Sequence, residues 1–226
     1  MDFITLVKTL RRECRVTGTN DTVTSPTESS EWQNLIEWVA QAWIEIQILH
    51  HNWKWMRTTA SFTTTVSKGD YSLSDLSITD HAEWLNKTGR IYLTASGTPD
   101  EQYLDFMEYE NFRDMYLFGT TRTQDSRPTV YTIDPTDGII MWPRPSDNYT
   151  VSIDYQKKPT ALALDADTPD MPERFHYLIV YDAMKKYAFS KAAQEVYDRG
   201  ELSGKPIRRA LRLDQLPRKA RGKSLI

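Results

Sequence analysis

The segment 31–56 has the strongest helical pattern in the chain, and it limits how the protein can fold. One apolar stripe recurs there at helical spacing, and a second stripe is rotated from the first. Because a surface helix of a monomer needs one apolar face, two stripes indicate either a central helix or a helix that also packs on a neighbouring subunit. The candidate subunit-interface residues are those of the second stripe, Trp38, Ala42, Ile46, Leu49 and Trp53.

Two further helices are predicted near the ends of the chain. Residues 2–15 carry apolar side chains at helical spacing, and Asp2 is placed to cap the first turn. The Ser- and Thr-rich segment 17–30 is predicted as a loop, and Ser30 with Gln33 has capping-box spacing before the second helix. Near the C-terminus, Asp170 and Glu173 form a capping pair, and the helix after them is predicted to end at Arg199 with Gly200 as its C-cap.

The middle of the chain has the pattern of an antiparallel sheet. Strands are predicted at 58–66, 89–95, 101–106, 127–133, 138–142 and 149–155, with a hairpin turn at 134–138 and one short helix at 109–119. The predicted fold class is therefore α+β. Residues 1–57 and 157–204 are expected to form a helical bundle, residues 58–156 a β-rich lobe with one inserted helix, and residues 205–226 an extended C-terminal arm.

Charge is divided unevenly along the chain. Residues 205–226 contain eight basic residues and one acidic residue, whereas residues 1–204 contain 20 basic and 30 acidic residues. Large aliphatic residues are interspersed in the basic segment, so it fits an ordered strap on an acidic protein partner, a nucleic-acid-binding tail, or a solvated end. The candidate partner-binding residues are Lys205, Ile207, Arg208, Arg209, Leu211, Arg212, Leu213, Leu216, Arg218, Lys219, Arg221, Lys223, Leu225 and Ile226.

Catalytic and metal-binding signatures are absent from the sequence. It has no phosphate-binding glycine loop, no dinucleotide fingerprint and no nucleophile elbow. Adjacent His50 and His51 do not have metal-ligand spacing, and the Asp165, Asp167, Asp170 run lacks the glycine and glutamate of a calcium loop. The Trp-rich segment 50–57 either stacks on bases or closes a helix end over a core. We expect no cofactor, no metal and no enzymatic activity.

Composition restricts the cellular setting. No apolar run approaches the roughly 18–20 residues of a membrane span, and the N-terminus has the reverse charge order of a secretion signal. A single cysteine, Cys14, excludes an intramolecular disulfide. We therefore expect synthesis and assembly in the cytoplasm and no membrane partner.

Several strings resemble the adaptor, or head–tail connector, proteins of tailed bacteriophages. They are LVKTLRRECRVTG (6–18), LIEWVAQAWIEIQ (35–47), NWKWMR (52–57), FRDMYLFG (112–119), RPTV (127–130), PERFHYLIVYDAMKKYA (172–188) and LRLDQLP (211–217). None of them is a catalytic motif.

The resemblance implies a twelve-subunit ring beneath the portal protein, located in the virion between head and tail. In such a ring the helical bundle forms the wall, and the C-terminal arm binds the portal. The β-rich lobe faces tail or nozzle proteins or neighbouring subunits, and genomic DNA passes through the channel without sequence-specific contacts. An acidic lumen would repel that DNA. The alternatives are a nucleic-acid-binding protein that uses the basic tail and a virion-associated hydrolase that uses carboxylates of the lobe.

Overall fold

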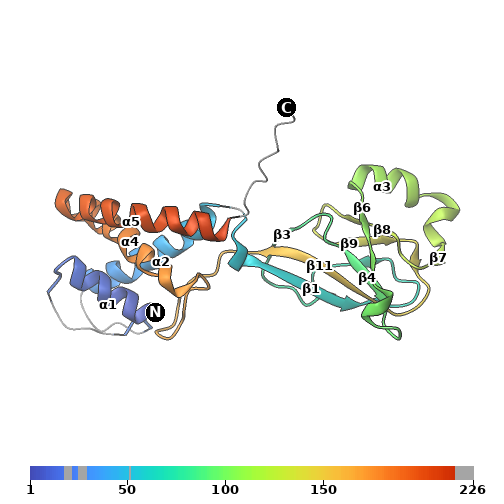
Figure 1. Cartoon of the computed structure of the whole chain (residues 1–226), viewed down its shortest axis with the longest axis horizontal. Helices are drawn as coiled ribbons and strands as arrows, with labels where there is room; N and C mark the ends of the chain where they lie inside the picture. Colours follow the sequence, from blue (N-terminus) through green and yellow to red (C-terminus); the bar gives the residue numbers. More distant parts are fainter. Residues whose placement is uncertain (18–21, 25–29, 51, 217–226) are drawn as a thin grey trace, which may run out of the picture. The chain divides into compact units, whose positions relative to one another are not determined.

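The chain divides into two compact units, which are described separately. The computed structural model describes residues 1–17, 22–24, 30–50 and 52–216. The helical unit comprises Met1–Met56 and Pro159–Ile226, and the strand unit comprises Arg57–Lys158 (Figure 1). The described residues contain five α-helices together with several sheets, so the predicted α+β class is confirmed.

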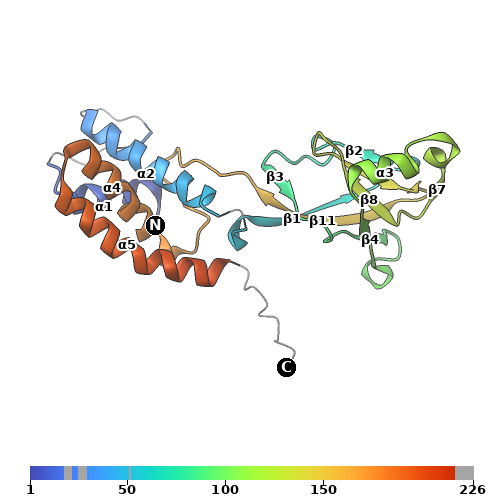
Figure 2. The same ribbon diagram turned by 90° about the horizontal axis from the view of Figure 1, so that it is seen from above.

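The helical unit is a bundle in which α4 packs against the other three helices (Figure 2). Its helices are α1 (Phe3–Glu13), α2 (Ser30–Ile48), α4 (Tyr177–Lys191) and α5 (Gln194–Gln215), with short 3₁₀ turns at η1 (Lys54–Met56) and η4 (Glu173–Phe175). The predicted Asp2 cap is present, since the Thr5 amide donates to the Asp2 carboxylate at 3.0 Å. Trp32, Leu35 and Trp43 of α2 lie in one buried cluster with Leu6 of α1 and Leu178 of α4.

Several helix boundaries differ from the predictions. Helix α2 ends at Ile48 rather than near residue 56, and a 3₁₀ turn follows. The predicted Asp170–Glu173 cap does not open an α-helix, because Glu173 begins the turn η4 and α4 starts at Tyr177 with His176 as its N-cap. The helix predicted to end at Arg199 is broken earlier, at Ala192 in the left-handed region (φ 53°). The predicted Gly200 C-cap is wrong, because Gly200 lies inside α5.

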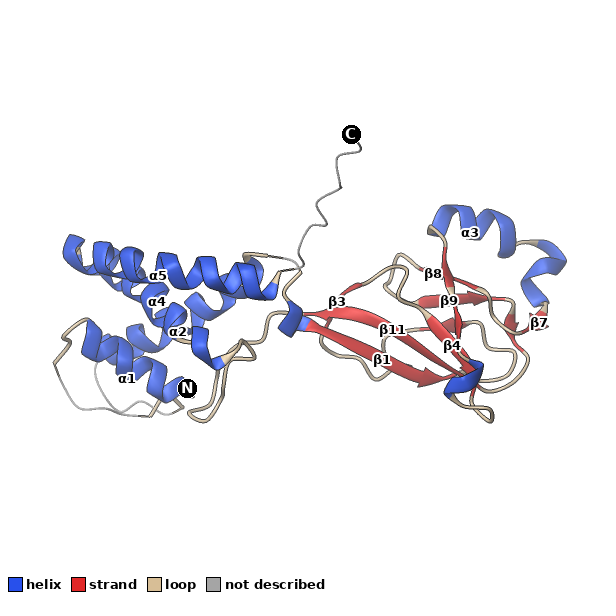
Figure 3. Ribbon diagram, in the orientation of Figure 1, coloured by secondary structure: helices blue, strands red, loops and turns tan. Residues whose placement is uncertain are grey.

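The strand unit contains two main sheets. The first has the order β1 (Arg57–Thr63), β11 (Tyr149–Lys157), β4 (Arg90–Leu93) and β5 (Gln102–Tyr103), and β3 (His81–Trp84) also pairs with β11 (Figure 3). The second has the order β2 (Asp70–Tyr71), β9 (Ile139–Trp142), β8 (Val130–Ile133) and β6 (Asp105–Phe106). A third, two-stranded sheet pairs β7 (Asp125–Ser126) with β10 (Arg144–Pro145), and α3 covers Tyr109–Tyr116.

The longest strand, β11, organises the core of this unit. Its residues alternate as predicted, and Tyr149, Val151, Ile153 and Tyr155 are buried. They lie in the same cluster as Tyr131 of β8, so one core holds both main sheets. The hairpin predicted from strands 127–133 and 138–142 is confirmed by the antiparallel register of β8 and β9.

The strand predictions were incomplete in three ways. The segment 101–106 divides into β5 and β6, which belong to different sheets. Strands β2, β3, β7 and β10 were not predicted. The pairs β6–β8 and β7–β10 are parallel, whereas the predicted lobe was antiparallel. Helix α3 ends near its predicted stop: its C-cap is Leu117, and Gly119 (φ 66°) begins the 3₁₀ turn η3 (Gly119–Thr123).

Candidate docking face on the last helix

Helix α5 has one face seated closely on α4. Its buried residues are Gly200, Gly204 and Leu211, which follow each other at helical spacing. A Cβ atom on Gly200 would lie 2.9 Å from the carbonyl oxygen of Tyr181 in α4, so only a glycine fits without displacement. The small residues thus let the two helices approach closely. Leu211, nearer the end of α5, belongs to the buried core of the helical unit.

The opposite face of α5 is exposed and mixes cations with aliphatic side chains. We call Leu202, Lys205, Pro206, Arg209 and Leu213 the outer face of α5; Leu202 is 74% and Leu213 67% exposed. The surface forms a depression of about 410 Å³ that is lined by Lys205, Pro206, Arg209 and Leu213. Lys205 and Arg209 form no salt bridge within the described part of the chain. A surface of this kind fits a partner that is acidic and partly apolar.

The predicted arm residues therefore fall into different environments. Lys205, Arg209, Arg212 and Leu213 are exposed, Ile207, Arg208 and Leu216 are partly buried, and Leu211 is 1% exposed. Residues 205–215 belong to α5, so only the residues after it remain for an extended arm. The other predicted arm residues, Arg218, Lys219, Arg221, Lys223, Leu225 and Ile226, lie outside the described residues.

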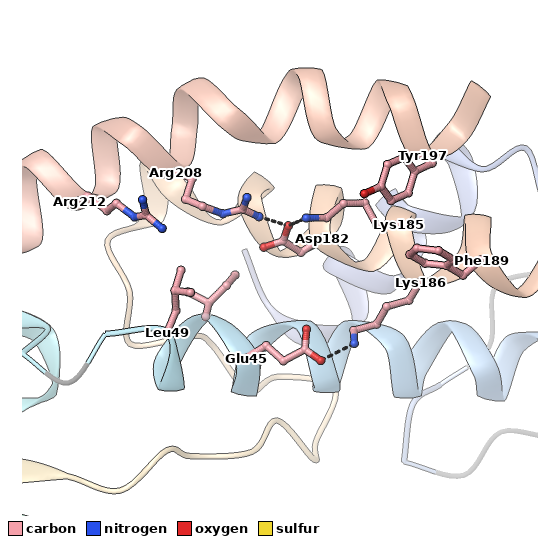
Figure 4. Close-up of a pocket in the computed structure, with 10 residues that line it drawn as sticks. Glu45, Leu49, Asp182, Lys185, Lys186, Phe189, Tyr197, Arg208 and Arg212 are labelled. Atoms are coloured by element: carbon pink, nitrogen blue, oxygen red, sulfur yellow. Dashed lines mark hydrogen bonds and ion pairs between the residues drawn. The ribbon is translucent and has the colours of Figure 1, made fainter. Parts of the chain in front are cut away.

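A groove lies beside this helix, between α2, α4 and α5 (Figure 4). Its volume is about 450 Å³. Arg208 of α5 and Lys185 of α4 converge on the Asp182 carboxylate, with Lys185 at 2.7 Å. Lys186 pairs with Glu45 across the groove at 2.5 Å. Arg212 lines the same groove and forms no ion pair among the described residues, so the groove carries excess positive charge.

The groove joins residues from two different predicted sets. Ile46 and Leu49 come from the predicted subunit-interface stripe, whereas Arg208 and Arg212 come from the predicted arm. The sequence analysis missed its other lining residues, among them Asp182, Lys185 and Phe189. No local signal marks them, because the groove arises where helices distant in sequence pack together. Phe189 is 78% exposed, which leaves an aromatic side chain at its margin.

The five predicted subunit-interface residues are mostly internal. Ala42, Ile46 and Trp53 are buried in the core of their own unit, and the Trp53 indole donates to the Ile46 carbonyl at 3.0 Å. These three side chains are therefore almost fully covered by residues of their own chain, with Ile46 at the floor of the groove. Trp38 is partly buried against the core and Leu49 is 45% exposed. The second stripe on α2 is thus explained chiefly by burial within one chain.

Residues considered for chemistry have structural roles here. Asp165 accepts bonds from the amides of Val23 and Thr24, and Asp167 accepts from those of Ala163 and Leu164, so both carboxylates fix loops. Burial raises the pKa of the Cys14 thiol to about 12, which keeps it protonated and unreactive at neutral pH. His51 lies outside the described residues.

The described residues contain no cluster suited to a metal ion and no helix suited to a membrane span. No group of three or more His, Cys, Asp or Glu residues there has the geometry to hold a metal ion. None of its helices combines the length and the apolar character that a bilayer span requires.

The sequence matches a known protein family over nearly its whole length. The class is that of the structural adaptors of bacteriophages, because the family described as "SU10 adaptor protein" matches residues 1–220. The chain belongs to this SU10 adaptor protein family, so the resemblance noted from the sequence is confirmed. No curated protein matches the chain.

Proposed function

We propose that this chain is one subunit of an adaptor ring that joins the portal to the tail of a bacteriophage virion. The ring, which we expect to be dodecameric, continues the DNA channel without sequence-specific contacts and carries tail or nozzle proteins on its other side. It has no enzymatic activity and assembles in the host cytoplasm. Membership of the adaptor family supports this proposal.

The outer face of α5 is the observation that carries the docking role. Exposed Leu202 and Leu213 flank the cations Lys205 and Arg209 on one helical stripe, and the segment 217–226 adds four basic residues directly after the helix. Each exposed arginine–carboxylate contact contributes about 1 kcal/mol or less, so one subunit binds the portal weakly. Twelve such contacts in a ring would give a strong attachment through avidity.

Contacts between subunits need side chains that remain accessible. Leu49 and Trp38 are the members of the predicted interface stripe that meet this condition, and Leu49 lies in the cationic groove of Figure 4. We propose that these two residues contact the neighbouring subunit, while Ala42, Ile46 and Trp53 support them from within the core.

The test removes charge and apolar area from the outer face without disturbing its buried side. An Arg209→Glu, Leu213→Asp double variant is expected to remain folded but to lose at least about tenfold of its affinity for portal-containing heads. Removal of residues 217–226 should have a similar effect. Removal of 205–226 is unsuitable, because it also deletes the buried Leu211. Arg12→Glu, at an exposed position on α1, is the matched charge-reversal control.

The measurement is co-sedimentation of the protein with portal-containing heads. Unchanged joining by both the double variant and the truncated chain would refute the docking role. Salt-sensitive DNA binding that the variants abolish, with portal joining intact, would instead favour a nucleic-acid-binding protein. Degradation of a cell-wall polysaccharide that depends on one carboxylate of the strand unit would favour a hydrolase.

A further inference from the structure

Strand β1 is an open edge of the first sheet. It pairs along its whole length, Arg57–Thr63, with β11, and no strand of the described chain pairs with its other side (Figure 3). The paired register is continuous from Arg57↔Gln156 to Thr63↔Thr150, without a bulge. Seven residues of regular strand therefore present one unpaired edge.

The hydrogen bonding fixes which backbone groups are unpaired. The Thr64 amide donates to the Tyr149 carbonyl at 2.7 Å, continuing the β1–β11 register. Antiparallel pairs alternate between bonded and non-bonded positions, so Thr58, Ala60 and Phe62 bond to β11. The amides and carbonyls of Thr59, Ser61 and Thr63 then point away from the sheet. They have no hydrogen-bond partner among the described residues.

This edge lacks the features by which proteins usually block strand addition. Natural edges carry lysines, prolines, bulges or a covering segment. β1 has the sequence RTTASFT, with no lysine and no proline. Its one charged residue, Arg57, is paired with Asp154 of β11. The open groups therefore select a ligand of one chemical kind, an extended backbone with few charges.

We propose that β1 pairs antiparallel with β1 of a second copy of this chain, about a two-fold axis at Ala60. Because only the odd-numbered residues of β1 have outward amides and carbonyls, odd-numbered residues of one copy must lie opposite odd-numbered residues of the other. Full overlap then sets Thr59 opposite Ser61 and Arg57 opposite Thr63. Both five-stranded sheets become one continuous sheet, with the buried faces of the two copies on the same side.

The strand is self-complementary in charge and size in this register. Each Arg57 lies opposite a neutral Thr63, so no like charges meet across the pair. The small Ala60, 9% exposed, lies opposite its own copy at a non-bonded position, where paired Cα atoms are closest. Phe62 of one copy lies opposite Thr58 of the other copy, on the buried face of the joined sheet. An aromatic residue opposite a β-branched one is a pair of the kind that stabilises sheets.

This pairing is independent of the proposed adaptor function. It uses the strand unit, whereas portal docking uses α5 of the helical unit. A two-fold contact joins only two copies, whereas neighbours in a cyclic ring contact each other head to tail. The proposed β1 pairing therefore applies to copies that are not part of a ring. The interface of one strand pair is small, and we expect a weak dimer that forms at high protein concentration.

Amide hydrogen exchange of the full chain at low and high concentration tests the proposal. At high concentration the amides of Thr59, Ser61 and Thr63 should become protected, whereas those of Thr58, Ala60 and Phe62 are protected at both concentrations. Sedimentation should show a dimer over the same range. Equal exchange of the odd-numbered amides at both concentrations would overturn the proposal, as would their protection only in the presence of another virion protein.

Two sets of variants check the edge and its register. Ser61→Pro removes an outward amide without removing a bond to β11, and it should raise the concentration for half-dimerisation by at least about tenfold. Ser61→Ala, the matched control, should dimerise normally, and a dimer that persists in folded S61P would contradict the proposal. If S61P does not fold, a mixture of T59C and S61C chains gives the answer. The mixed 59–61 disulfide should exceed both like-with-like disulfides, and a statistical mixture would exclude this register.

Discussion

Helix α5 and strand β1 are both outer elements of their units, but they expose different chemistry. The backbone of α5 is bonded within the helix, so its outer face offers side chains, Lys205, Arg209 and Leu213 among them. Strand β1 exposes the backbone amides and carbonyls of Thr59, Ser61 and Thr63, whose side chains are short and neutral.

The difference determines how each surface recognises a partner. Binding to the outer face of α5 depends on charge, so it is weakened by salt and by substitution of single side chains. Pairing along β1 depends on main-chain bonds, so it tolerates side-chain changes and responds to proline. One chain thus combines a side-chain surface in its helical unit with a backbone surface in its strand unit.

The largest effect is expected from a substitution in the core that supports the helical unit. Trp53→Ala should lower the free energy of unfolding by about 3–5 kcal/mol, because the side chain is fully buried and its indole bond to Ile46 is lost. Chemical denaturation with amide exchange should show the loss in the helical unit and leave the protection of β11 unchanged. Leu49→Ala, at an exposed position of the same predicted stripe, is the control and should change stability by less than about 1 kcal/mol.

The Trp53→Ala variant also distinguishes a core role of Trp53 from a role in a subunit interface. A purely interfacial Trp53 would leave the isolated chain as stable as the wild type at low protein concentration. Equal loss of amide protection in both units would show that they unfold together. The helical unit and the strand unit would then not differ in stability.

A smaller effect should come from the contact that seats α5 on α4. Gly200→Ala is expected to destabilise the helical unit by about 1–3 kcal/mol, because its Cβ would meet the Tyr181 carbonyl at 2.9 Å. Gly204→Ala is the matched control. Its Cβ would meet side-chain atoms at ordinary distances of 3.4 Å or more, and alanine favours the helix by up to about 1 kcal/mol. Thermal unfolding should therefore move in opposite directions, and the same direction for both would disprove the close approach.

The smallest effect concerns the attachment of β1 to β11. Burial raises the pKa of Asp154, but bonds from Thr59 and Arg57 outweigh it and hold this pKa below its usual range. A carboxylate with a lowered folded-state pKa stabilises the fold above its unfolded-state pKa of about 3.9, and this contribution is lost as the pH falls through the folded-state value. Asp154→Asn should thus cost less than about 1 kcal/mol at pH 7.

A pH series of unfolding free energies measures this contribution. The difference between wild type and Asp154→Asn should shrink below about pH 4 and vanish at the lowest pH. Asp105→Asn, at an exposed position on β6, is the control. A difference that stays constant down to the lowest pH would mean that the Asp154 charge does not hold β1.

The sequence predicted the elements with strong periodicity and missed those fixed by distant contacts. The alternation of Tyr149, Val151, Ile153 and Tyr155 located β11, and the turn residues located the β8–β9 hairpin. Strand β2 has only two residues, and β3 is buried at its two ends rather than at alternate positions, so neither has a local strand pattern. The division of 101–106 between two sheets depends on which strands lie nearby. Gly200 was misassigned because a glycine after a helical stripe usually caps a helix, whereas here it permits close packing.

The candidate docking face was also predictable only in part from the sequence. The basic and aliphatic composition of 205–216 was evident in the sequence, but not which side chains remain exposed. Burial of Leu211 and exposure of Leu213 follow from how α5 packs on the core of the helical unit, and the groove beside α5 needs α2 and α4 together.

The order of residues alone fixed the α+β class, the main helices and strands, the basic end of the chain and the likeness to phage adaptors. These properties are local or compositional, since periodicity and charge are complete within a short segment. Only the tertiary structure decided that 205–215 continue a packed helix, that most of the second α2 stripe is internal, and that one edge of β1 is open. Each of these depends on which distant residues lie alongside, and a single segment carries no record of its neighbours in space.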